Sequence, residues 1–164
     1  MAQTGSVAVN RAIRILSANT GLLYSIQAIS ELSGVELTPI LRGQIHAINV
    51  APEVAERSAG VQYPSVYVFC DRVKNTLKEK FRTFSGQVRT NIEVRVSHDR
   101  LEGIEHALQL YVDAITGVLD NNRGDWGGGP FFGGSYEITF GQVKHGGTNF
   151  VQTARVSFEL EMSR

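Results

Sequence analysis

The sequence has one cysteine, no long apolar run and no excess of charge of either sign. The lone Cys70 excludes an intrachain disulfide and a zinc site made of four thiolates. No segment approaches the roughly 18 apolar residues of a membrane span, and no basic segment followed by an apolar one marks a secretory signal. Lys plus Arg and Asp plus Glu both number 16, so the chain lacks the basic excess of a typical stand-alone nucleic-acid binder.

The 164 residues fit one domain with a substantial core. Hydrophobic residues make up 42% and charged residues 20% of the chain, which argues against wholesale disorder. The glycines form neither a phosphate-binding loop nor a dinucleotide-binding fingerprint. Composition therefore indicates a globular domain without an evident nucleotide site.

Helical spacing of apolar residues occurs in two parts of the chain. Residues Ser6–Leu32 predict two short helices or one broken helix, because Asn-Thr-Gly at 19–21 is a turn signal and Gly34 is a suitable stop. A longer helix is predicted over Asp99–Leu119, with Asp99 as its cap and Glu102 completing a capping-box pair. Its apolar stripe comprises Leu101, Ile104, Leu108, Tyr111, Val112, Ile115 and Leu119.

Strand patterns occupy the centre and the end of the chain. We predict strands at Ser65–Cys70 and Gln87–Ser97, then a terminal hairpin of Tyr136–Phe140 and Thr153–Met162 around a turn at 145–149. Strict alternation gives the sheet one apolar and one polar face, as in antiparallel sheets. The polar face would carry Arg89, Glu93, Arg95, Arg155, Glu159 and Glu161.

Together these elements predict an α+β fold, a mostly antiparallel β-sheet with one face covered by helices. Residues 35–62 have no periodicity that we could assign, so we expect an extended arm or loop there, with a short strand within 44–50 as an option. The predicted organisation is an N-terminal helical segment (1–34), that arm (35–62) and an α+β core domain (63–164), forming a single globular domain overall.

The segment Gly124–Gly134 holds six glycines in eleven residues together with three large aromatic residues. We predict a loop, either a flexible connector or a docking element whose aromatic rings seek a partner surface. The interface candidates in it are Trp126, Phe131 and Phe132.

A basic run surrounds Val73–Phe81, a segment that could form a helical turn or two. A solvated face is the simpler interpretation, and a surface facing DNA is the alternative, since phosphate contacts need no sequence motif. The candidates for contact with DNA are Lys74, Lys78 and Lys80.

Titratable residues cluster near the predicted start of the long helix, namely His98, Asp99, Glu102, Glu105 and His106. They permit a divalent metal site, but Glu102 and His106 have the wrong spacing for a carboxylate-bridged metal bundle, and an acidic first turn explains them more simply. Cys70 ends an apolar strand without an activating motif, so we predict an inert buried thiol. We predict no catalytic residues, no metal and no cofactor.

The last hundred residues resemble the tail terminator proteins of long-tailed bacteriophages. The resemblance rests on the order of four stretches: 63–68 (Tyr-Pro-Ser-Val-Tyr-Val), 87–96 with Ile-Glu-Val at its centre, the helix over 99–119, and the closing strand 156–162. No diagnostic residue set supports it, and other neck and tail-completion proteins share this plan. The N-terminal helices and residues 35–62 exceed the most compact terminators.

The resemblance implies a structural virion protein, assembled in the host cytoplasm, that forms a ring of about six copies on the head-proximal end of the tail tube. Its partners would be the tail tube protein, the head–tail connector or neck proteins, and DNA passing through the lumen without sequence recognition. Interface candidates on the polar face are Arg89, Arg95, Arg155 and Glu159. Competing hypotheses are a connector, stopper or tube subunit and, from another class, a small metal-dependent hydrolase or nuclease.

Overall fold

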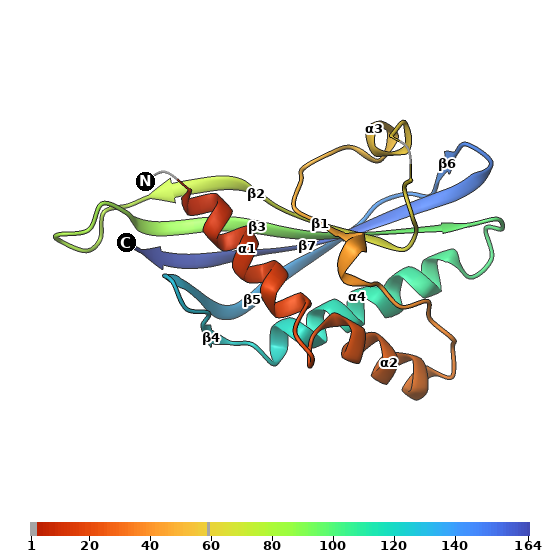
Figure 1. The fold of residues 1–164 in the computed structure, drawn as a ribbon, viewed down its shortest axis with the longest axis horizontal. Helices are drawn as coiled ribbons and strands as arrows, with labels where there is room; N and C mark the ends of the chain where they lie inside the picture. The colour runs from red at the N-terminus through yellow and green to blue at the C-terminus, as the bar shows by residue number, and fades with distance from the viewer. Residues whose placement is uncertain (1–2, 59) are drawn as a thin grey trace.

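The alternating apolar residues of four long strands build the centre of one sheet. In the computed structural model, which describes residues 3–58 and 60–164, the sheet order is β1-β2-β3-β7-β5-β4, and β6 also pairs with β7. Only β1 and β2 run parallel; the other pairs are antiparallel. The strands are β1 (Ile45–His46), β2 (Ser65–Asn75), β3 (Ser85–His98), β4 (Gly124–Asp125), β5 (Pro130–Phe140), β6 (Lys144–Gly146) and β7 (Asn149–Ser163) (Figure 1).

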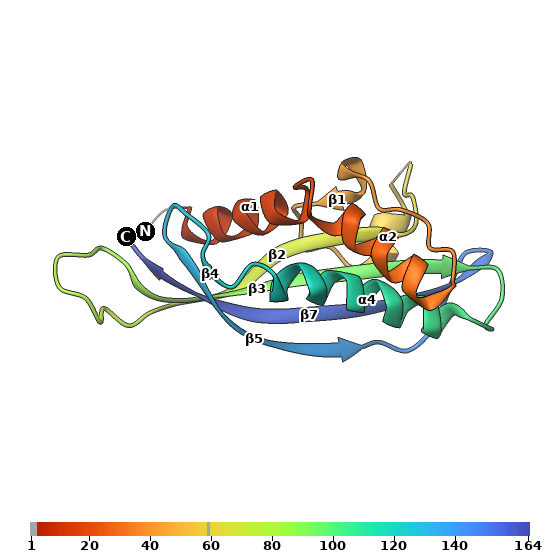
Figure 2. The same cartoon turned by 90° about the horizontal axis from the view of Figure 1, so that it is seen from below.

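Three helices cover one face of this curled sheet (Figure 2). Helices α1 (Thr4–Leu16) and α4 (Ile104–Asp120) pack on the strands, and α2 (Leu22–Ser33) packs on α4. The hydroxyl of Ser25 donates a hydrogen bond to the carbonyl of Ala114 (2.7 Å) and ties α2 to α4. The predicted α+β fold, with a mostly antiparallel sheet and helices on one face, is confirmed. No helix in the described part of the chain is long and apolar enough to cross a membrane.

The predicted break between the first two helices is confirmed, and a glycine explains it. A Cβ atom at Gly21 would lie 2.4 Å from the carbonyl oxygen of Leu16, so only glycine permits this tight turn. Gly34 follows α2 with φ +72°, the left-handed conformation that ends many helices.

The core lies between the helices and the apolar face of the sheet. Val88, Ile92 and Val94 of β3 are fully buried, as are Leu108 and Ile115 of α4. The two-residue period of the strand and the helical stripe therefore meet in one core, as the sequence predicts.

The long helix begins later than predicted. It starts at Ile104 after Gly103, whose φ of +80° breaks the helical path, so Asp99 and Glu102 precede the helix and cap nothing. Leu101, predicted to lie in the apolar stripe, is exposed. The early start was predicted because Asp99 and Glu102 have the spacing of a capping box.

For residues 35–62 we expected an extended arm or loop, with a short strand within 44–50 as an option; that strand is present, and the segment also holds short helical turns. These elements are a 3₁₀ turn, η1 (Arg42–Gln44), the short strand β1 and a helix, α3 (Pro52–Glu56). Leu37, Ile40 and Ile45 are buried in the core, although no regular period connects them. The hydroxyl of Tyr111 on α4 donates to the carbonyl of Thr38 (2.7 Å), which fixes the first part of this segment to the helical layer.

Candidate functional site

The face of the sheet that points away from α1 and α4 is lined by polar and charged side chains. Strand register places Tyr67, Glu93 and Arg155 in one row across β2, β3 and β7. A second row, nearer the β2–β3 hairpin, holds Arg72, Arg89 and Glu159. The polar face predicted from the alternation is therefore present, and its two ends differ in how deeply their charged side chains are buried.

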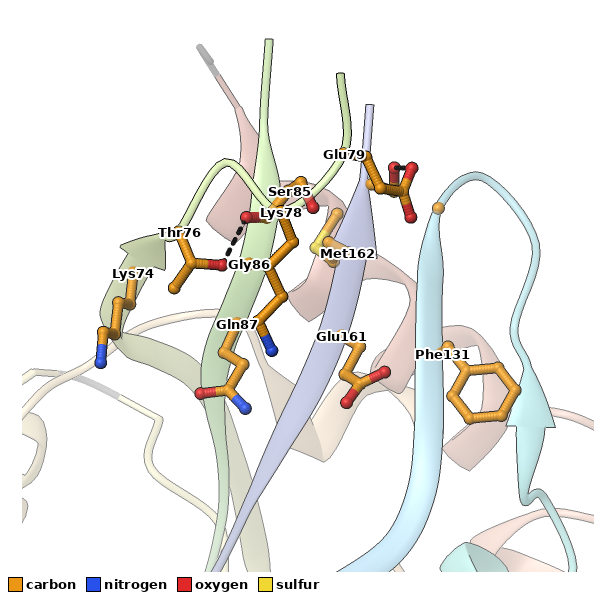
Figure 3. Close-up of a pocket in the computed structure, with 12 residues that line it drawn as sticks. Lys74, Thr76, Lys78, Glu79, Ser85, Gly86, Gln87, Phe131, Glu161 and Met162 are labelled. Atoms are coloured by element: carbon orange, nitrogen blue, oxygen red, sulfur yellow. Dashed lines mark hydrogen bonds between the residues drawn. The ribbon is translucent and has the colours of Figure 1, made fainter. Parts of the chain in front are cut away.

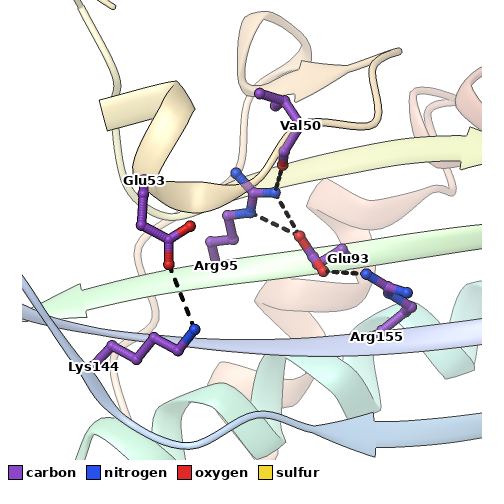
Figure 4. A network of polar contacts seen from close by, with 6 residues as sticks. All are labelled: Val50, Glu53, Glu93, Arg95, Lys144 and Arg155. Atoms are coloured by element: carbon purple, nitrogen blue, oxygen red, sulfur yellow. Dashed lines mark hydrogen bonds and ion pairs between the residues drawn. The ribbon is translucent and has the colours of Figure 1, made fainter. Parts of the chain in front are cut away.

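One end of this face, which we call the covered end, lies under the segment that leads into α3. The guanidinium of Arg95 donates through Nε (2.8 Å) and Nη2 (2.6 Å) to Glu93 Oε2, and Nη2 also donates to the carbonyl of Val50 (Figure 4). Arg155 Nη2 donates to the other carboxylate oxygen of Glu93 (3.1 Å). The Arg95 guanidinium also lies over the Tyr67 ring, 3.8 Å from its centroid.

Arg95 was expected on an open polar face and is instead buried, with its side chain 2% exposed. The reason is that residues 47–58 turn back over this part of the sheet, with Lys144 Nζ lying 3.5 Å from Glu53 at the margin. A buried guanidinium needs a charged partner, and Glu93 supplies one. Arg95 therefore holds the cover segment onto the sheet and does not line an accessible surface in this structure.

The covered end changes the protonation of a neighbouring histidine. Burial, followed by the positive charges of Arg95 and Arg42, lowers the pKa of His46, which precedes the cover segment. The His46 ring contacts Tyr67 (4.9 Å between centroids). This environment favours the neutral imidazole near neutral pH.

The other end of the polar face, which we call the open end, is not overlain by the segment leading into α3. Arg72 and Glu159 form an ion pair there, and Arg89 Nε lies 3.3 Å from Asp71 Oδ1. The four side chains are 26–56% exposed, in contrast to the Glu93–Arg95 pair. The charges at this end can therefore exchange partners with another molecule.

A shallow hollow of about 400 Å³ lies where the open end meets the β2–β3 hairpin (Figure 3). Lys74 and Gln87 line it from β2 and β3, and Glu161 and Phe131 line it from β7 and β5. Its mixed lining and wide opening suit a flat macromolecular contact better than an enclosed small-molecule site.

The basic run is not helical. Lys74 belongs to β2, and Lys78 and Lys80 lie in the loop of the β2–β3 hairpin, so the expected helical turn at 73–81 is wrong. Phe81, which sequence reasoning did not single out, is fully exposed, and Leu77 is 61% exposed. Both take positive φ values (66° and 48°), which non-glycine residues seldom adopt. Because basic residues surround Leu77 and Phe81 in the sequence, this exposed apolar tip was not predicted.

The glycine-rich segment is a loop only at its centre, since it begins with β4 and ends with the start of β5. Phe132 is 1% exposed and packs edge-on against Phe158 (5.4 Å between centroids). Trp126 is partly buried against the same two rings, and its indole N–H donates to the carbonyl of Asn122 (2.6 Å). Trp126 and Phe132 therefore have aromatic partners within the chain. Only Phe131, 46% exposed, remains available to another surface.

The titratable residues near α4 do not form a cluster. Within residues 3–58 and 60–164, no group of three or more His, Cys, Asp or Glu side chains could hold a metal ion. Cys70 is half-buried next to Gly5 of α1, and burial raises the pKa of its thiol.

Comparison with known proteins identifies no family. No protein-family model matches the chain, and no curated protein matches it significantly. Among solved structures, the chain is similar to one from the virion of a native gene transfer agent particle, at 13% identity and a TM-score of 0.35. The match covers 87% of this chain and 92% of the other. A similarity this weak carries no functional argument.

Proposed function

We propose that the protein is a structural component of a phage-like virion, a tail terminator that forms a ring on the head-proximal end of the tail tube. The observation that carries the proposal is the division of one sheet into an apolar face under helices and a polar face with an uncovered, mixed-charge end. In a ring, such a sheet can turn its polar face to a water-filled lumen and its helices outward. The order of strands and helices in residues 63–164, which resembles that of tail terminators, also supports the proposal.

On this proposal Arg89, Arg155 and Glu159 face the lumen or a subunit boundary. Lys74, Lys78 and Lys80 lie along the β2–β3 hairpin, which extends beyond the helical layer (Figure 1). They would contact phosphates of the passing DNA without reading its sequence. The rest of the open end carries charges of both signs, including Asp71, Glu159 and Glu161, which limits how tightly DNA would be held.

A tail tube subunit is the competing function in the same class, because it also needs a sheet with a polar lumen face. The two differ in assembly: a terminator stops at a closed ring, whereas a tube subunit stacks into an open polymer. Electron microscopy of the purified protein, alone and mixed with tail tubes, separates them. Rings bound at one tube end support the terminator, and long stacks formed by this protein alone contradict it.

A further inference from the structure

The sheet ends in two strand edges whose backbone is free over several residues. Beyond Phe132, β5 pairs only with β7 as far as Phe140, because β4 reaches just residues 131 and 132. At the opposite edge, β2 pairs only with β3 over residues 72–75, because β1 reaches just residues 66 and 67. Across the described parts of the chain, no other strand pairs with either stretch.

These edges have some of the features that usually protect a free strand, namely a β-bulge in each strand and charged side chains, but they lack others. Neither stretch contains proline, and both carry exposed apolar side chains on the helix-side face of the sheet. Ile138 and Phe140 of β5 are 36% and 44% exposed, although the residues opposite them on β7 are buried. Val73 of β2 is 39% exposed in the same way. Burial of these side chains would favour contact with another strand.

The polar faces of the two edges carry opposite charges. Arg72 and Lys74 project from the β2 edge, and Glu137 projects from the β5 edge. Apolar side chains therefore lie on the helix-side face of each edge. The polar face of β2 carries Arg72 and Lys74 beside one acidic residue, Asp71, which already lies against Arg89, whereas the polar face of β5 carries Glu137. Each edge is complementary to the other, not to itself.

We propose that β5 of one copy pairs with β2 of the next copy and continues the sheet between subunits. Strands β2, β3, β7 and β5 alternate in direction, so the next β2 in that series runs antiparallel to β5. This pairing places Ile138 and Phe140 beside Val73 on one face, and Glu137 near Arg72 or Lys74 on the other.

Two-fold pairing of identical edges is the alternative arrangement and is less favourable. Pairing β5 with β5 brings two Glu137 carboxylates to one face, and pairing β2 with β2 gathers Arg72 and Lys74 with their own copies. Like charges opposite one another destabilise a strand pair. The structure thus favours a head-to-tail contact, which propagates until it closes as a ring or grows as a fibre. Closure of the ring rests on the proposed function; the edge contact itself does not.

Engineered cysteines test the contact in the full-length chain. In a Cys70→Ser background, Val73→Cys is combined with Ile138→Cys and, separately, with Phe140→Cys, so that two registers are sampled. Within one copy, β2 and β5 are three strand spacings apart, about 14 Å, beyond the roughly 7 Å limit between Cα atoms for a disulfide. Any disulfide between the two positions must therefore join two copies.

We expect the double variants to give a covalent ladder on mild oxidation of concentrated protein, whereas each single-cysteine variant stays monomeric. A control pair, Val73→Cys with Gln109→Cys on the exposed face of α4, should give no ladder. Dimers from Ile138→Cys alone would show two-fold pairing, and monomers from both double variants would show no edge contact. Either result overturns the proposal.

Charge variants test the complementarity separately. Glu137→Lys should lower the yield of the ladder by up to about fivefold, since a cross-strand ion pair is worth up to about 1 kcal/mol. Adding Lys74→Glu should restore part of it, and Glu105→Lys on α4 should leave it unchanged. A ladder that ends at a fixed copy number supports the ring, while one that extends without limit keeps the edge contact and contradicts the terminator.

Discussion

The covered and open ends of the polar face use the same kind of ion pair in different surroundings. At the covered end Glu93 and Arg95 are buried under residues 47–58, whereas at the open end Arg72 and Glu159 remain largely in solvent. A buried charge that loses its partner is left desolvated, whereas an exposed charge regains water. The covered end therefore contributes to folding, and the open end is available for assembly.

Removing the buried carboxylate of Glu93 should cause the largest loss of stability and so test the contrast between the two ends. Glu93→Ala leaves Arg95 buried and unpaired, and we expect a loss of about 3–5 kcal/mol in the free energy of unfolding. Denaturant unfolding monitored by circular dichroism measures it. The matched variant Glu159→Ala should cost about 1 kcal/mol or less. Equal losses would show that the two ends do not differ.

In the glycine-rich segment, two adjacent aromatic residues differ in burial in the same way. Phe132→Ala removes a buried ring and should cost about 3–5 kcal/mol. Phe131→Ala, at a half-exposed position on the opposite face, should change stability by about 0.5 kcal/mol or less. Thermal or denaturant unfolding of both variants checks this. A small loss of stability in Phe132→Ala would make Phe132 a candidate for docking again.

These two regions also show what the sequence alone could predict. Alternation in 87–97 correctly separated an apolar from a polar face, because side-chain direction follows directly from strand geometry. It could not predict that Arg95 is buried, since the cover comes from residues 47–58, whose contacts follow no period. Nor could the sequence predict that Trp126 and Phe132 pack on Phe158, because that contact arises only through long-range strand pairing.

Removal of an exposed pair should have a small and salt-dependent effect on stability. Arg72→Ala, Glu159→Ala and the double variant form a cycle in which we expect a coupling energy of about 1 kcal/mol or less, declining with added salt. A coupling energy that is several times larger, or that salt leaves unchanged, would mean that the open end is also shielded from water.

The smallest expected effect is the pH dependence contributed by His46. Because its pKa is lowered in the folded state, His46 contributes stability in full above its unfolded pKa, near 6.5, and this contribution is lost as the pH falls through the lowered folded value. His46→Gln should therefore flatten the decline in stability on the acid side of neutrality. The measurement is unfolding free energy against pH for both proteins, and identical slopes would contradict the assignment.

The most direct test of the central claim is the position of this protein in assembled particles. Tails purified from infected cells can be labelled with antibody against the protein and imaged by electron microscopy. A terminator should label one end of each tube, on the side that joins the head. Label along the whole tube would identify a tube subunit, and particles without label would contradict a virion role.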